Sequence, residues 1–105
     1  MKRLYILEID ANRGDGLKLE AYPVMKENPR GVLYRRDDTI TQYYGLRNMN
    51  VTQVMANGTK ARCVFLSVDS RAEDDIRLRK LALIDALNAE GQRRAINLNR
   101  MEDAV

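Results

Sequence analysis

The chain has 105 residues, of which 45% are apolar and 31% are charged, and its net charge is +3. This length and composition describe one globular domain and not a disordered chain. With no histidine, no tryptophan and one cysteine, the chain lacks the residues for a Ser-His-Asp triad, an internal disulfide or the usual zinc site. We therefore expect a protein that is not an enzyme and that binds no metal or cofactor. Among enzymes, the remaining alternative is one that uses carboxylates and a bound metal.

The first residues resemble a signal peptide only briefly. The apolar stretch that begins at Leu4 ends at Glu8 and Asp10, well short of the ~7–15 apolar residues of a signal core. Nothing approaches the ~20 apolar residues of a membrane span. A lone cysteine fits a reducing compartment. We expect a soluble, cytoplasmic protein that does not bind membranes.

The first two thirds of the chain read as strands. Residues 2–10 are apolar on both faces, which is typical of a central strand. Residues 17–25 form a second strand, which Pro23 makes an edge strand or a bulged one because proline lacks an N–H. Residues 32–36 and 39–44 are the third and fourth strands.

The strongest local signal is the pair Asn57-Gly58. It stands between residues 50–56 and 59–68, both rich in strand-forming side chains. Asn-Gly favours the two positive φ angles of a type I′ turn, whose twist matches the flanking strands. We predict a hairpin there, with the second arm in the core.

One long helix is expected over residues 71–90. Ser70 and Glu73 match a capping box, and Gly91 is a natural stop. Residues 92–105 fit a short helix, a strand or a frayed tail. The predicted fold is α+β: a single domain over residues 1–105, with an antiparallel sheet of five or six strands in residues 1–69 packed against this helix.

The helix carries apolar residues on two sides. The stripe expected to cover the sheet is Ala72, Ile76, Leu83, Ala86 and Leu87. The opposite stripe is Leu78, Leu81 and Ala82. Either the C-terminal segment folds back over this second stripe through Ile96, Leu98 and Met101, or the stripe is an interface, or its leucines are ordinary surface residues. We predict a homodimer through Leu78, Leu81 and Ala82.

Tyrosine and arginine cluster on the third and fourth strands. The candidate partner-binding residues are Tyr34, Arg35, Arg36, Tyr43, Tyr44 and Arg47. Tyr and Arg are enriched at protein-binding hot spots and are also the residues that bind single-stranded nucleic acid. Asp37 and Asp38 lie within the cluster and would repel phosphate. A solvated sheet face is the third interpretation.

These features favour a small non-enzymatic interaction protein of adaptor or inhibitor type that binds a protein partner. The alternative is an RNA- or DNA-binding module that uses the Tyr/Arg cluster. A short, strand-rich chain with a terminal helix and no catalytic residue set has the general look of an accessory protein of a phage or mobile element.

Overall fold

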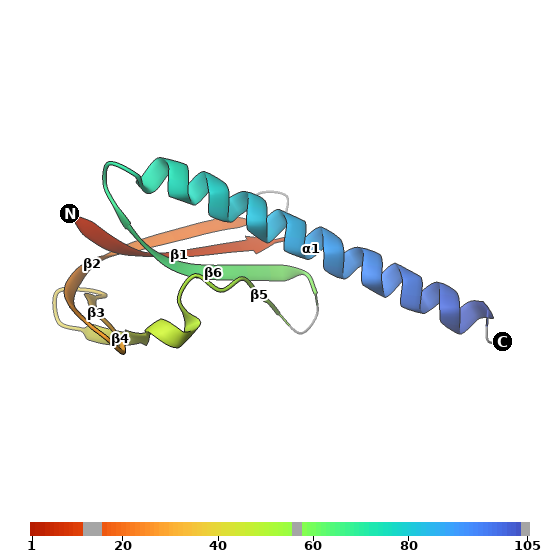
Figure 1. The fold of residues 1–105 in the computed structure, drawn as a ribbon, viewed down its shortest axis with the longest axis horizontal. Coiled ribbons are helices and arrows are strands. Elements are labelled where there is room, and N and C mark those ends of the chain that lie inside the picture. The colour runs from red at the N-terminus through yellow and green to blue at the C-terminus, as the bar shows by residue number, and fades with distance from the viewer. Residues whose placement is uncertain (12–15, 56–57, 104–105) are drawn as a thin grey trace.

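The computed structural model describes residues 1–11, 16–55 and 58–103, with side chains up to residue 91. Within these residues the chain forms a curled, six-stranded antiparallel sheet with one long helix on one face (Figure 1). This confirms the predicted α+β class. The elements are β1 (Lys2–Asp10), β2 (Leu17–Asn28), β3 (Gly31–Arg35), β4 (Thr41–Gly45), the 3-10 helix η1 (Leu46–Asn48), β5 (Gln53–Val54), β6 (Lys60–Val68) and α1 (Ala72–Asp103).

The strand order is β4-β3-β2-β1-β6-β5, so β1 lies in the middle of the sheet. Leu4 and Leu7 point to opposite faces of β1, and both are fully buried. The prediction of a central strand that is apolar on both faces is therefore confirmed. The face that carries Leu7 is covered by α1, and we call the opposite face, which carries Leu4, the concave face.

Strand β2 is bent in its middle. Its first half, up to Pro23, pairs with β1, and its second half, from Val24 onward, pairs with β3. The register with β3 shifts between Val24 and Lys26, which marks the bulge that Pro23 predicts. The strand is longer than the expected 17–25, and it lies inside the sheet order. The bend turns β3 and β4 across the concave face at the end of the sheet that holds the N-terminus (Figure 1).

Strands β3 and β4 pair as a hairpin, within a residue or two of the predicted ranges. Asp37 organises the turn between them: its Oδ1 accepts hydrogen bonds from the Thr39 N–H at 2.8 Å, the Thr39 hydroxyl at 2.9 Å and the Ile40 N–H at 2.9 Å. These donors, chiefly the two of Thr39, hold the pKa of Asp37 below its usual value. Asp37 is thus occupied in the turn, as aspartate at a turn start commonly is.

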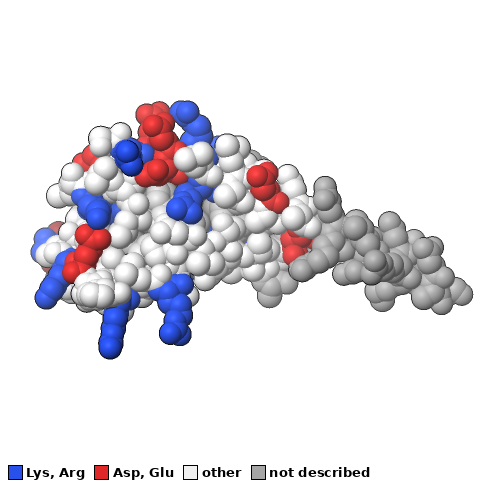
Figure 2. Space-filling model, viewed as in Figure 1, with Lys and Arg blue, Asp and Glu red and all other residues white. Residues whose placement is uncertain are grey.

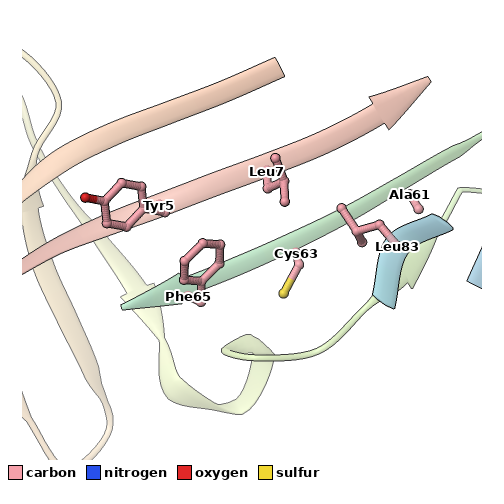
Figure 3. Close-up of a cluster of buried hydrophobic side chains, with 6 residues drawn as sticks. All are labelled: Tyr5, Leu7, Ala61, Cys63, Phe65 and Leu83. Atoms are coloured by element: carbon pink, nitrogen blue, oxygen red, sulfur yellow. The ribbon is translucent and has the colours of Figure 1, made fainter. Parts of the chain in front are cut away.

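The core under α1 is built from β1, β6 and the helix. Its buried residues, drawn in Figure 3, are Tyr5, Leu7, Ala61, Cys63, Phe65 and Leu83. The rings of Tyr5 and Phe65 stack with centroids 5.4 Å apart. The Arg79 guanidinium lies 5.7 Å from the Phe65 ring centroid and donates to the Asn50 side chain at 3.0 Å. Burial raises the pKa of the Cys63 thiol, so Cys63 behaves as a small core residue.

A second core fills the concave face where β3 and Met49, the residue after η1, pack against β1 and β6. Its buried members are Leu4, Val32, Tyr34, Met49 and Val64. Half-buried residues complete it, among them Tyr22 and Tyr44. The sheet therefore has a protein layer on both faces at this end, which explains why β1 and β6 are apolar on both sides.

Helix α1 differs from the prediction at its C-terminal end. It runs from Ala72 to Asp103, through Gly91, and not from 71 to 90. Glycine ends a helix by adopting a positive φ, and Gly91 does not have one. Of the alternatives for the second stripe, the fold-back of the C-terminal segment is wrong over residues 92–103, because α1 continues there as one helix beyond the sheet (Figure 1). Residues 104–105 lie outside the described residues. The first turn of α1 is acidic, and Asp75 in it accepts a 2.5 Å hydrogen bond from the buried Ser67 hydroxyl.

The predicted hairpin joins β5 and β6, which pair antiparallel. Its first arm is only Gln53–Val54, shorter than expected. Asn57 lies outside the described residues, but Gly58 has a φ of 69° and donates its N–H to the Met55 carbonyl at 2.8 Å.

Replacement of Gly58 by valine should therefore destabilise the protein by about 1–3 kcal/mol, because a β-branched residue is strained at positive φ. Chemical denaturation measures the loss. Gly91→Ala is the control, since among the described residues nothing outside the neighbouring backbone of α1 lies within 4 Å of the new Cβ and alanine is the better helix former. A Gly58→Val protein with an unchanged midpoint would contradict the turn geometry.

Candidate partner-binding site

The six residues of the predicted Tyr/Arg cluster do not form one patch. The strands that carry them do pair, with Tyr34 opposite Gln42 and Leu33 opposite Tyr43. Because side chains alternate along a strand, Tyr34 and Tyr44 face the concave side, where they belong to its core. Arg35 and Tyr43 occupy the alternate positions on the opposite face, and both are exposed.

Each remaining member has a different environment. Arg36 directly follows β3 and lines a pocket on the concave face. Arg47 lies in the last turn of η1 and is exposed. The Tyr44 hydroxyl donates to the Asn48 carbonyl at 3.2 Å, and burial raises the pKa of Tyr44. Of the six residues, the structure brings only Tyr34 and Arg36 to the same pocket.

This pocket is an open, polar hollow of about 230 Å³ on the concave face. It is lined from five strands and the β3–β4 turn by Ile6, Glu8, Lys18, Glu20, Tyr22, Tyr34, Arg36, Gln42 and Arg62. Most of its wall was not predicted as a site. Lys18, Glu20 and Tyr22 alternate with apolar residues in the sequence, which is the one signal that places them together on a polar face.

One side of the pocket is a chain of contacts along β2. Lys18 Nζ lies 3.0 Å from Glu20 Oε1, and the Tyr22 hydroxyl donates to the other oxygen of the same carboxylate. The hydrogen bond from Tyr22, followed by that from Lys18, holds the pKa of Glu20 below its usual value. The same bond to Glu20 raises the pKa of Tyr22. Glu20 is therefore anionic and well satisfied at neutral pH.

The other side is formed by the β3–β4 hairpin and β6. Gln42 Oε1 accepts from the Tyr34 hydroxyl at 2.9 Å and from Arg36 at 3.4 Å. Arg62 lies opposite Glu8 in the β1–β6 register, and its Nε is buried with no hydrogen-bond partner among the described residues. A buried N–H without an acceptor is costly. Because Arg62 also lines the pocket, a shift of its side chain would bring this donor to an acceptor that enters the pocket.

The wall of the pocket is polar and carries charges of both signs. Three cationic side chains, two carboxylates and two tyrosines surround it, and the two tyrosine rings, of Tyr22 and Tyr34, pack against each other with centroids 5.4 Å apart. Among the described residues, no three His, Cys, Asp or Glu side chains gather in a way that could hold a metal ion. No described helix combines the length and apolar character needed to cross a membrane.

The predicted dimer stripe on α1 is on the surface. Leu78 is 65% exposed, Leu81 is 54% exposed, and Ala82 is also exposed. Ile84 adds a further exposed apolar side chain on this part of the helix. The stripe that covers the sheet is confirmed, since Leu83 is fully buried and Ala72, Ile76 and Leu87 pack beside it.

Comparison of the chain with models of protein families, with curated proteins and with solved structures finds no significant match. The site is therefore interpreted from its own geometry.

Proposed function

We propose that this is a small non-enzymatic interaction protein, of adaptor or inhibitor type, that binds a protein partner through the concave pocket. The observation that carries the proposal is the guanidinium group of Arg62, which lines the pocket together with Arg36 and whose buried Nε has no acceptor within the described residues. A carboxylate side chain of the partner would accept from this group. Such charge-assisted hydrogen bonds are stronger than neutral ones.

The size of the pocket favours a side chain over a free ligand. Pockets for small molecules usually measure ~300–1,000 Å³, whereas this one holds about 230 Å³. One inserted side chain of a larger partner fits that volume. Arg and Tyr around a pocket are also the composition of a protein-binding hot spot.

Nucleic acid is the second candidate, and the structure offers it less support. Glu8 and Glu20 line the pocket, and the β3–β4 turn beside it holds Asp37 and Asp38. On the face shown in Figure 2, basic and acidic residues are interspersed and do not form a continuous basic track. The rings of Tyr22 and Tyr34 pack on each other, which leaves less ring surface for base stacking.

The proposal places the protein in the cytoplasm, where the single buried Cys63 would stay reduced. An accessory protein of a phage or mobile element would act there on a host protein.

Neighbouring arginines test the site, because Arg36 lines the pocket and Arg35 lies on the opposite face of the same hairpin. Immobilised protein is exposed to lysate with and without nuclease, the captured protein is identified and purified, and its affinity is measured for each variant. We expect Arg36→Ala and Arg62→Ala to weaken binding by about 2 kcal/mol, or roughly 30-fold, and Arg35→Ala to have little effect.

The outcomes separate the two functions. A captured protein that survives nuclease and depends on Arg36 and Arg62 supports the proposal. If nuclease treatment abolishes capture and binding weakens steeply as salt rises, the protein binds nucleic acid instead. Equal loss in Arg35→Ala and Arg36→Ala would place the site elsewhere on the hairpin.

A further inference from the structure

The outer edge of β2 is open over its first half. On one side, residues from Leu17 onward pair with β1, but β3 pairs with β2 only from Val24. Leu17 is 47% exposed and Leu19 is 43% exposed. Among the described residues, no backbone hydrogen bond is made on this outer side between Leu17 and Ala21. Strands with such an edge are templates for pairing with another strand.

The hydrogen-bond pattern shows which backbone groups are available there. The Asp10 N–H donates to the Gly16 carbonyl at 2.9 Å, in line with the β1–β2 register. Hydrogen-bonded pairs alternate along an antiparallel ladder, so the even-numbered residues of β2 bond to β1. Leu17, Leu19 and Ala21 therefore direct their N–H and C=O groups outward.

We propose that two copies of this chain associate through this edge, with residues 17–21 of one copy pairing antiparallel with residues 17–21 of the other. The two-fold axis passes between the two Leu19 residues, which form the central hydrogen-bonded pair. Leu17 of each copy pairs with Ala21 of the other. The two sheets become one continuous sheet, and its two helices lie on the same face.

Charge selects this register. With Leu19 at the centre, Lys18 of each copy lies opposite Glu20 of the other, in the positions where antiparallel side chains approach most closely. A neighbouring register that still pairs outward-facing residues moves the centre to Lys18 or to Glu20. It would place two lysines or two glutamates face to face. The segment is therefore self-complementary in one register.

The side chains on both faces of the sheet are compatible with this pairing. Lys18 and Glu20 lie on the concave face, where they already attract each other within one chain at 3.0 Å. The residues on the helix face, Leu17, Leu19 and Ala21, are apolar and exposed. A lone lysine protects an edge from pairing, but here Glu20 on the second copy compensates it. The exposed stripe of α1 offers no comparable feature that would set a register.

The edge dimer goes beyond the partner-binding function and does not require the pocket to be filled. Light scattering and sedimentation across a concentration series measure it. We expect a weak dimer in the wild type. Lys18→Glu or Glu20→Lys should raise the dimer Kd about tenfold, because two attractive pairs become repulsive. The double variant Lys18→Glu with Glu20→Lys should restore the dimer, and Lys26→Glu, on the same strand beyond the bulge, is the matched control.

A backbone variant tests the edge without a change of charge. Leu19→Pro removes an outward N–H, and proline is tolerated on an open edge, so we expect a folded monomer by circular dichroism and sedimentation. A wild type that is monomeric at every concentration overturns the proposal. So does a dimer that is lost in Leu78→Glu with Leu81→Glu but kept in both single charge reversals, since that result assigns the interface to α1.

Discussion

Leu83→Ala should lower the free energy of unfolding by about 2–5 kcal/mol, the range expected when a buried leucine leaves a cavity. Leu83 is fully buried and is the helix residue in the core that α1 shares with β1 and β6. Figure 3 shows it pointing to the sheet beside Ala61 and Cys63. These neighbours belong to a sheet that is fixed by its own hydrogen bonds, so the cavity cannot close easily.

Leu81→Ala is the matched control, two residues away on the same helix. Leu81 is 54% exposed, and surface substitutions usually change stability by less than ~0.5 kcal/mol. Urea denaturation of both variants at one concentration measures the difference. Equal losses for Leu81 and Leu83 would mean that both sides of α1 are covered, and the arrangement of the helix on the sheet would be wrong.

The sequence was most informative where local patterns and packing agree. In β1, the apolar residues on both faces predicted a central strand, and both layers exist, one under α1 and one under β3 and Met49. In α1, the spacing of Ile76, Leu83 and Leu87 predicted the buried stripe. The two patterns hold because each is a direct consequence of which faces the tertiary structure covers.

The end of α1 was mispredicted for a local reason. Gly91 has the residue type of a helix stop, but a glycine ends a helix in this way only when it adopts a positive φ. Gly91 lacks a positive φ, and α1 continues to Asp103. The stripe at Leu78 and Leu81 is therefore exposed, because no returning segment of the described chain packs over it.

The pocket could not be predicted because it depends on distant pairings. Arg62 and Glu8 become neighbours only through the β1–β6 register, and Arg36 reaches them only because β2 bends after Pro23. The sequence places Tyr43 beside Tyr44 and Arg35 beside Arg36, yet strand alternation sends each pair to opposite faces. The fold therefore separates the tyrosines and arginines that are adjacent in the sequence. It brings together polar residues from several strands to form the pocket.

The pocket and the β2 edge share residues, which couples the two proposals. Lys18 and Glu20 line the pocket and also carry the self-complementary charges of the edge. A dimer would bring a second Lys18 and Glu20 next to each pocket, on the same face of the sheet. A partner that contacts Glu20 would then bind monomer and dimer with different affinities, and by linkage it would shift the dimer equilibrium by the same factor.

Gly31→Ala is the second substitution with a large expected effect, and it acts through the β3–β4 hairpin. Gly31 is buried at the start of β3. A Cβ at this position would lie 2.4 Å from the Tyr43 ring carbon Cζ and 2.5 Å from the Tyr44 carbonyl oxygen. The Tyr43 side chain is on the surface and can move, but the Tyr44 carbonyl belongs to the backbone that pairs with β3. Overpacking of this kind costs about 1–3 kcal/mol or more.

Gly45 provides the control, because it pairs directly with Gly31 across the hairpin. A Cβ at Gly45 would come no closer than 4.0 Å to the Arg30 carbonyl oxygen, so Gly45→Ala should leave the denaturation midpoint nearly unchanged. Adding Tyr43→Ala to Gly31→Ala should recover only part of the loss, since the contact with the Tyr44 carbonyl remains. Full recovery would show that the tyrosine ring alone excludes a side chain at position 31, whereas equal midpoints for Gly31→Ala and Gly45→Ala would contradict the close packing of the two strands.

Because Tyr34 and Gln42 of this hairpin line the pocket, Gly31→Ala should also weaken partner binding, and Gly45→Ala should not.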